Sequence, residues 1–167
     1  ELKKETLYNC KMVQAQDGVS VESDTLGALL YPLEGDTFAL DMVIKPERYH
    51  EFGIALHVDK ELETGYFLRM NPKNQLVAWD MWPRGEQGRY QWQIKGDVPY
   101  QIETARKLPK AEEYRVHIIK EKDICVVYIN DEIVLSTRMY NHKDGYAGIY
   151  VVQGNVKLIQ YKEKRSE

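Results

Sequence analysis

The segment Phe38–Lys45 reads FALDMVIK, with large apolar residues at every second position. The same period of two recurs in Phe52–Val58 (FGIALHV) and in Ile133–Arg138 (IVLSTR). Alternation over about four to eight residues is typical of a half-buried β-strand, because successive side chains point to opposite faces of a sheet. These three segments therefore predict strands that turn one face toward a core.

Turn-forming residues divide the rest of the chain into strand-length pieces. Turns are expected at Asp17-Gly18, Glu34–Asp36, Asn71–Asn74, Asn130-Asp131, Lys143–Gly145 and Gln153–Asn155. This spacing predicts about a dozen strands, the less distinct of which merge, and at most one short helical turn in Lys107–Glu113. The predicted fold class is all-β: a two-sheet antiparallel β-sandwich or jelly roll.

Composition indicates one globular unit. Of the 167 residues, 43% are hydrophobic and 29% charged, which is the balance of a soluble domain. We expect residues 1–167 to form a single β-sandwich domain, excised from a larger protein because the sequence opens without Met or a signal peptide. The net charge of −3 and the dispersed Lys and Arg predict no nucleic-acid partner. No apolar run approaches the roughly 20 residues that cross a bilayer, so no membrane partner is expected.

The cysteines and histidines form no metal-binding pattern. Cys10 and Cys125 are expected to be buried free thiols, with a single disulfide as the alternative, because a domain of this size needs no covalent cross-link. No ligand spacing links the four histidines, so neither a metal nor a cofactor is expected. These histidines are His50, His57, His117 and His142.

Catalytic motifs are absent as well. A β-sandwich glycosidase needs two carboxylates flanking the sugar, which on a single strand appear as acidic residues alternating along one face. Asp41 and Asp80 are each isolated on their strands. No nucleophile elbow, P-loop or dinucleotide-binding glycine motif occurs. The sequence therefore predicts a binding domain with no catalytic residues.

The segment from Gly65 to Trp82 predicts a β-hairpin with two unlike faces. The loop Asn71–Asn74 would set Met70 opposite Gln75 and Arg69 opposite Leu76. One face is apolar and belongs in the core: Tyr66, Leu68, Met70, Val77, Trp79 and Met81. The other face mixes apolar and charged residues: Phe67, Arg69, Leu76, Ala78, Asp80 and Trp82.

This mixed face has the residue types that bind sugars. The C–H faces of sugars stack on aromatic rings, while their hydroxyls accept hydrogen bonds from Arg and donate to carboxylates. All three tryptophans lie within Trp79–Trp92. The alternative is ordinary packing beneath a loop with a surface ion pair between Arg69 and Asp80. The predicted carbohydrate-binding residues are Arg69, Asp80, Trp82, Arg84, Tyr90, Trp92, Glu51 and His57.

Two of these residues precede the hairpin in the sequence, and three follow it within Trp79–Trp92. His57 falls on the polar side of the alternating strand Phe52–Val58, where the bland alternative is a surface histidine. Glu51 belongs to the loop Glu47–Glu51, which contributes to the rim of the same site if it lies beside the hairpin.

The C-terminal half carries a resemblance to a known family. VVYIND at 126–131, followed by STRMY at 136–140, resembles the closing strands of the C-terminal β-sandwich of glycoside hydrolase family 32, the invertases, levanases and inulinases. The segments Gly65–Arg69 and Ala78–Asp80 are compatible with it. The resemblance covers about residues 37–160, and the same strand pair also occurs in laminin-G-like and other concanavalin-like sandwiches.

The resemblance implies a detached accessory domain, since the catalytic propeller motifs of that family are missing. Some members are levan-type carbohydrate-binding modules that hold a terminal fructose with acidic, Arg and Trp side chains. The implied function is thus non-catalytic binding of fructan. The implied partners are an oligo- or polysaccharide and the catalytic domain of a glycoside hydrolase in the parent chain, in an extracellular setting by analogy.

Three other functions stay open from the sequence. One is a structural domain that buttresses a family 32 propeller, which predicts a contiguous exposed apolar patch. Another is a small β-sandwich glycosidase, and the last is a protein-binding sandwich. The sequence specifies neither the sugar nor the cellular compartment.

Overall fold

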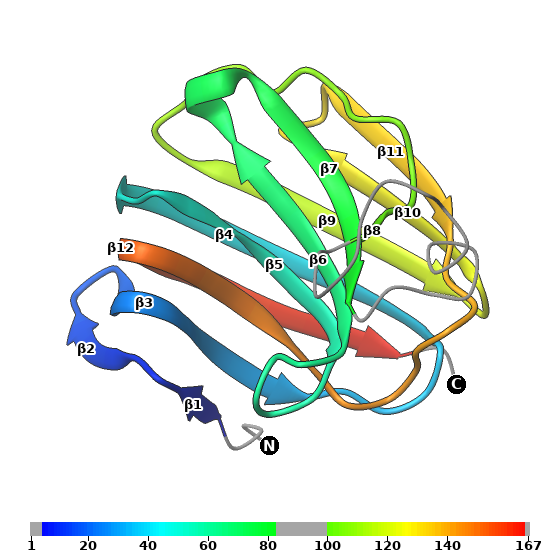
Figure 1. Cartoon of the computed structure of the whole chain (residues 1–167), viewed down its shortest axis with the longest axis horizontal. Helices are drawn as coiled ribbons and strands as arrows, with labels where there is room; N and C mark the ends of the chain where they lie inside the picture. The colour runs from blue at the N-terminus through cyan, green and yellow to red at the C-terminus, as the bar shows by residue number, and fades with distance from the viewer. Residues whose placement is uncertain (1–4, 83–99, 166–167) are drawn as a thin grey trace.

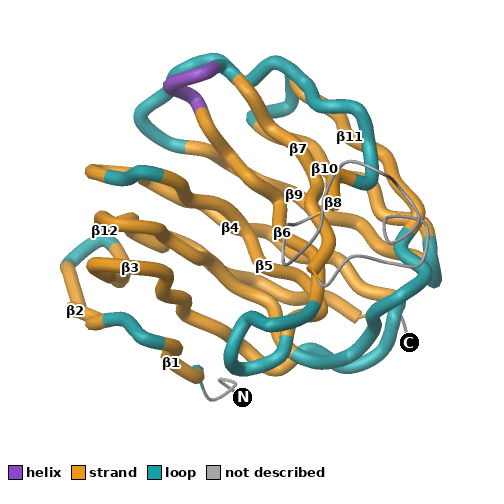
Figure 2. The backbone as a smooth tube through the Cα atoms, in the orientation of Figure 1, coloured by secondary structure: helices purple, strands orange, loops and turns teal. Residues whose placement is uncertain are grey.

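The computed structural model describes residues 5–82 and 100–165, and its regular structure is almost entirely β-strand (Figure 2). In chain order the strands are β1 (Thr6–Tyr8), β2 (Lys11–Ala15), β3 (Gly18–Pro32), β4 (Thr37–Arg48), β5 (Glu51–Val58), β6 (Gly65–Asn71), β7 (Leu76–Trp82), β8 (Tyr100–Gln101), β9 (Tyr114–Glu121), β10 (Ile124–Ile129), β11 (Ile133–Arg138) and β12 (Tyr146–Arg165). The all-β prediction is confirmed.

The strands form two layers that share β3 and β12 (Figure 1). Residues 146–152 of β12 pair with β5 and with the end of β3, and β6, β7 and β8 extend this first layer. Residues 155–165 pair with β4, and β9, β10 and β11 extend the second layer. All of these pairs are antiparallel, as the predicted sandwich requires.

Strand β12 passes from one layer to the other through a bend at Gln153 and Gly154. The register with β3 shifts between Val152 and Gly154, and Gln153 has a φ of 51°. A Cβ on Gly154 would lie 1.8 Å from the carbonyl oxygen of Arg48, so no larger residue fits without moving the backbone. The bulge turns one long strand into a member of both sheets.

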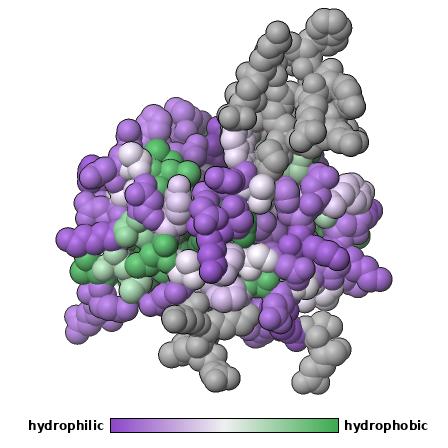
Figure 3. Space-filling view, turned by 60° about the horizontal axis from the view of Figure 1, so that its bottom comes forward, coloured by the Kyte–Doolittle hydropathy of each residue, from purple (hydrophilic) through white to green (hydrophobic). Residues whose placement is uncertain are grey.

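The core fills the space between the layers and follows the predicted alternation. In β4 the apolar set at every second position is buried, and the residues between are partly exposed. Trp79 is fully buried, as expected for the apolar face of the hairpin. On the face that Figure 3 shows, most of the surface is hydrophilic and apolar residues gather in separate patches.

The hairpin of β6 and β7 has the predicted faces in a different register. Met70 lies opposite Val77, where the expected partner was Gln75, and Arg69 lies opposite Ala78. The connection has the expected four residues but begins one residue later, because residues 72–74 form the 3₁₀ helix η1 and Gln75 adopts a left-handed conformation with φ 54°. The shift amounts to two residues along β7, so every side chain stays on its predicted face.

Other local predictions have mixed outcomes. Cys10 and Cys125 are free, and burial raises the pKa of the Cys125 thiol to about 12, while Cys10 is only partly buried. The segment Lys107–Glu113 contains no helix, so the helical turn considered there is wrong. Within the part of the chain that the structure describes, no helix has the length and apolar character to span a membrane.

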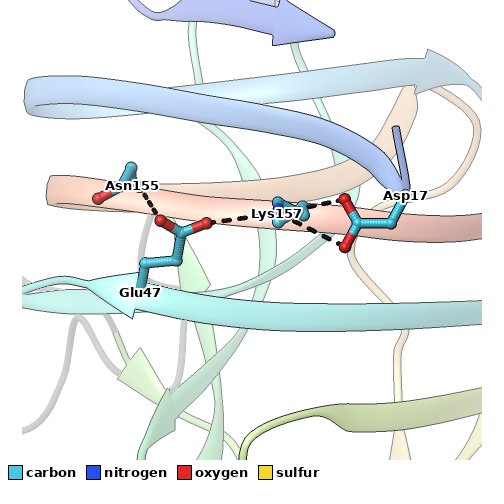
Figure 4. A network of polar contacts seen from close by, with 4 residues as sticks. All are labelled: Asp17, Glu47, Asn155 and Lys157. Carbon is cyan, nitrogen blue, oxygen red and sulfur yellow. Dashed lines mark hydrogen bonds and ion pairs between the residues drawn. The ribbon is translucent and has the colours of Figure 1, made fainter. Parts of the chain in front are cut away.

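A polar network on the outer face of the second layer joins three chain segments (Figure 4). The Lys157 ammonium on β12 lies 3.2 Å from Asp17 in the β2–β3 turn and 3.9 Å from Glu47 near the end of β4. Glu47 also accepts a 2.8 Å hydrogen bond from Asn155. The hydrogen bond from Lys157 lowers the pKa of Asp17. The network holds the β2–β3 turn and the end of β4 against β12.

The predicted exposure of His57 is wrong. Its side chain is 3% exposed and lies between the rings of Phe38 and Tyr66, both of which are core residues. His57 has a φ of 55° at a bulge where the β5–β12 register shifts, and this extra residue reverses the alternation after Leu56. Desolvation lowers the pKa of His57 to about 4, although Nδ1 lies 2.8 Å from the carbonyl oxygen of Asp144.

We expect His57 to make the fold sensitive to acid. Its pKa of about 4 in the folded state lies below the ordinary value of 6.5. Between pH 6.5 and 4 the unfolded chain binds a proton at this histidine more readily than the folded chain does. The free energy of unfolding is therefore highest above pH 6.5 and declines by about 3 kcal/mol as the pH falls to 4. Chemical unfolding at pH 7, 6, 5 and 4 should show a weaker pH dependence in His57→Asn, since Asn tolerates positive φ and does not titrate.

The exposed His50 provides the matched control, because His50→Asn makes the same substitution at a solvent-exposed histidine. Equal slopes for the wild type and His57→Asn would contradict a buried neutral imidazole at position 57.

Candidate functional site

The outer face of the first layer contains a pocket of about 300 Å³ that we call the Asp80 pocket. This volume lies at the lower end of the range of about 300–1,000 Å³ for small-molecule sites. Strands β3, β5, β6, β7 and β12 contribute residues to it, together with the β5–β6 connection. Its lining consists of Leu26, Glu51, Leu62, Phe67, Asp80, Trp82, Tyr150 and Val152.

Small residues lie on the outer face of the sheet, next to the larger side chains at the pocket. Gly53 lies next to Tyr150 on one side and Arg69 on the other, and Ala55 lies next to Phe67. A Cβ on Gly53 would lie 1.9 Å from the carbonyl oxygen of Leu68, so the backbones of β5 and β6 approach too closely for a larger residue. The close approach of these two strands thus requires glycine at position 53.

An ion pair between Arg69 and Asp80 lies at this pocket. Arg69 Nε donates to Asp80 Oδ2 over 3.0 Å, and the two side chains are diagonal neighbours because Asp80 lies opposite Phe67. Only 12% of the Asp80 side chain is exposed. Burial raises the pKa of Asp80, and the guanidinium of Arg69 opposes that rise without cancelling it.

A second carboxyl group, Glu51, comes from the neighbouring strand β5. It lies opposite Val152 on β12, and the buried Tyr150 hydroxyl donates a hydrogen bond to it. Burial raises the pKa of Glu51; the charge of Arg69 lowers that pKa, and the charge of Asp80 raises it further. Two carboxyl groups and one guanidinium therefore interact electrostatically at the pocket.

Aromatic and aliphatic side chains form the rest of the wall. The rings of Phe67 and Tyr150 meet edge to face, with centroids 5.5 Å apart and planes at 87°. Trp82, at the end of β7, is half-buried. Such a site offers an apolar surface for C–H groups and fixed acceptors for hydroxyl donors. Among the described residues, no group of three or more His, Cys, Asp or Glu side chains is arranged to hold a metal ion.

The structure brings four of the predicted site residues together. Glu51, Asp80 and Trp82 line the Asp80 pocket, and Arg69 is bonded to Asp80. His57 does not join them, because the bulge in β5 turns it into the core. The predicted residues that lie outside the described ranges are Arg84, Tyr90 and Trp92.

Four lining residues were missed in the sequence: Leu26, Leu62, Tyr150 and Val152. Tyr150 and Val152 had a usable signal, since they alternate with the core residues Ile149 and Val151 and so must face outward. Leu62 lies in the β5–β6 connection, where no periodicity marks it. Leu26 follows an irregular part of β3, so its side of the sheet was not predictable from spacing.

Breaking the Arg69–Asp80 pair should cost stability. Arg69→Met keeps the aliphatic stem and leaves a buried carboxylate without its partner, which should lower the free energy of unfolding by about 1–3 kcal/mol. Arg138→Met is the matched control, because Arg138 pairs with Asp123 at 3.4 Å with 57% of its side chain exposed. That variant should change stability by less than about 0.5 kcal/mol. Equal effects in urea unfolding would contradict a special role for the Asp80 pair.

No protein-family model matches the sequence, and no curated protein is significantly similar to it in sequence. The fold has relatives among solved structures. The carbohydrate binding module CBM66 from Bacillus subtilis superposes with a TM-score of 0.78 at 18% identity, covering 96% of this chain and 94% of that one.

Two further solved structures also share the fold. The exoplasmic/lumenal domain of VIP36, in its Ca²⁺- and Man3GlcNAc-bound form, has a TM-score of 0.64 at 10% identity, covering 98% of this chain and 84% of that one. Chicken galectin 2 has a TM-score of 0.55 at 10% identity, covering 84% and 98%. At these identities the similarities establish a β-sandwich of the kind found in carbohydrate-binding modules and lectins.

Proposed function

We propose that this chain is a non-catalytic carbohydrate-binding module that holds a saccharide in the Asp80 pocket, with β-fructan or a terminal fructose as the favoured ligand. The observation that carries the proposal is the convergence of Trp82, Glu51 and the Arg69–Asp80 pair on one hollow. The sequence predicts these residues as sugar-binding groups. They lie on three separate strands.

The chemistry of the pocket fits a neutral polyol. The ionised carboxylates of Glu51 and Asp80 accept hydrogen bonds from hydroxyl donors, and bonds to charged acceptors are stronger than those to neutral ones. Trp82 and Phe67 supply aromatic surface for the C–H side of a sugar ring. Leu26 and the other aliphatic residues exclude water around those contacts.

The fold relatives support the same class of ligand. CBM66 is a carbohydrate binding module by name, and a VIP36 structure contains Man3GlcNAc. The preference for fructan comes from the resemblance of segments 126–131 and 136–140 to glycoside hydrolase family 32. In this proposal residues 1–167 form one domain of a longer extracellular glycosidase, where the module keeps the catalytic domain close to its substrate.

Glycoside hydrolysis is a second candidate function, because Glu51 and Asp80 bring two carboxyl groups to one pocket. The sequence pattern did not reveal this pair, because the two residues come from β5 and β7 and not from a single strand. Raised carboxyl pKa values are also typical of catalytic acids. Binding is the stronger interpretation, because Asp80 is engaged by Arg69 and Glu51 by Tyr150 within the protein itself.

Removing the aromatic ring or the carboxylate of the pocket should weaken sugar binding. Isothermal titration with levan oligosaccharides should give a Kd on the order of 10⁻⁴ to 10⁻⁵ M for the wild type. We expect Trp82→Ala and Asp80→Asn each to weaken binding at least about tenfold, equivalent to about 1.4 kcal/mol. Tyr140→Ala, which removes a 71% exposed tyrosine that does not line the pocket, should bind like the wild type.

Two outcomes would contradict this assignment. Unchanged levan affinity in both Trp82→Ala and Asp80→Asn would move the ligand away from the Asp80 pocket. Release of reducing sugar from levan by the wild type, abolished in Glu51→Gln, would replace binding by hydrolysis as the function.

Sugar affinity should also decline in mild acid. Burial raises the pKa values of both Glu51 and Asp80, and only their ionised forms accept hydrogen bonds at both oxygens. The Kd for levan oligosaccharides should therefore rise on acidification at a higher pH than the pH near 4 at which ordinary carboxyl groups titrate. Near-ultraviolet circular dichroism at each pH separates this effect from unfolding. Affinity that stays constant until the protein unfolds in acid would show that the carboxyl groups do not accept bonds from the sugar.

A further inference from the structure

The outer face of the second layer contains another hollow, of about 550 Å³, which we call the Tyr128 hollow. It lies on β4, β9, β10 and β12 and shares no lining residue with the Asp80 pocket, which is on the other layer. Its lining includes Asp41, Arg115, His117, Tyr128, Asp131 and Gln160. Nothing in the proposed function so far uses these residues.

Strand pairing places an aromatic ring, an imidazole and a carboxylate in one row. Tyr128 on β10 lies opposite His117 on β9, and His117 lies opposite Asp41 on β4. Tyr128 is 36% exposed, and its ring centroid lies 6.2 Å from that of His117 with the planes tilted by 35°. The side chains of His117 and Asp41 are 41% and 35% exposed. The row is therefore accessible to a ligand from solvent.

A hydrogen bond orients the imidazole within this row. His117 Nδ1 is bonded to Asp41 Oδ1, and an ionised carboxylate only accepts, so Nδ1 carries the hydrogen. In the neutral ring Nε2 is then an acceptor. The second oxygen of Asp41 and the amide of Gln160 add further polar groups. The hollow thus combines an aromatic ring with both acceptors and donors.

The charges around the hollow favour a neutral ligand over an anion. Arg115 lies 3.8 Å from Asp131, so the guanidinium in the lining is already paired with a carboxylate. Interfaces between proteins are depleted of charged residues at their centres, whereas Asp41 and its imidazole partner occupy the middle of this row. Neutral polyols match a ring beside fixed polar groups.

An apolar strip continues from the ring. Val134 on β11 lies opposite Tyr128 and is 45% exposed, and Ile119 on β9 is 42% exposed. The C–H groups of successive sugar units could pack on this apolar strip beyond the hollow. We propose that the Tyr128 hollow is a second saccharide-binding site, so that the chain binds polysaccharide through two outward faces; the choice of ligand class rests on the proposed function.

Two separate sites predict avidity for polymers. A polysaccharide that occupies one site raises the effective concentration of sugar at the other, whereas a short oligosaccharide occupies one site at a time. Tyr128→Ala should therefore weaken binding to polymeric levan at least about tenfold, while the affinity of the Asp80 pocket for a short levan oligosaccharide stays unchanged.

Amide spectra of the ¹⁵N-labelled chain test the proposal directly. The probes are oligosaccharides of levan, inulin, mannan and galactan, titrated into the wild type, Trp82→Ala, Tyr128→Ala and Tyr128→Phe. We expect saturable shifts at Asp41, His117 and Gln160 that persist in Trp82→Ala and in Tyr128→Phe, which keeps the ring, and that vanish in Tyr128→Ala. The exposed Tyr140→Ala again serves as the matched control.

The outcomes separate the two sites. Shifts confined to the Asp80 pocket with all four probes would overturn the second site and leave the proposed function standing. Shifts confined to the Tyr128 hollow would support the second site and overturn the first. Concentration-dependent sedimentation that disappears in Tyr128→Ala, without any sugar-induced shift, would identify a protein-contact surface and overturn the proposal.

Discussion

Strand β12 belongs to both layers because its backbone bends at Gln153 and Gly154, where a Cβ would collide with the carbonyl oxygen of Arg48. Everything else is positioned relative to that bend. Before it, Tyr150 and Val152 face the Asp80 pocket beside β5. After it, the strand turns to β4 and contributes Gln160 to the opposite face. A straight β12 would leave one of the two sheets without its central strand.

At the carboxyl groups on the outer face of the first layer, burial disfavours the ionised form and pairing with Arg69 favours it. Arg69 stabilises the ionised form of Asp80, yet desolvation is the larger effect and the pKa of Asp80 still rises. Glu51 follows the same balance with Tyr150 as its hydrogen-bond donor. Burying these carboxyl groups costs folding free energy, and carboxyl groups with perturbed pKa values cluster at functional sites.

Period-two alternation was enough to predict the fold class and to assign each residue of the β6–β7 hairpin to its face. The register was not predictable, because the 3₁₀ turn and the left-handed Gln75 move the four-residue connection one residue along the chain without a sequence marker. His57 was misplaced for a related reason, since a bulge reverses alternation at one residue. The pocket needed tertiary information, because Glu51, Asp80 and Tyr150 are far apart in sequence and meet only through strand order.

The bond between Arg69 and Asp80 exists before any ligand arrives, and this has a thermodynamic consequence. Freezing a long, flexible side chain on association costs about 1 kcal/mol. Here that loss of rotamer freedom has already occurred during folding, so the guanidinium and the carboxylate are ordered before the ligand binds. A small preorganised pocket of this kind therefore binds a small ligand more tightly than a flexible surface of the same composition would.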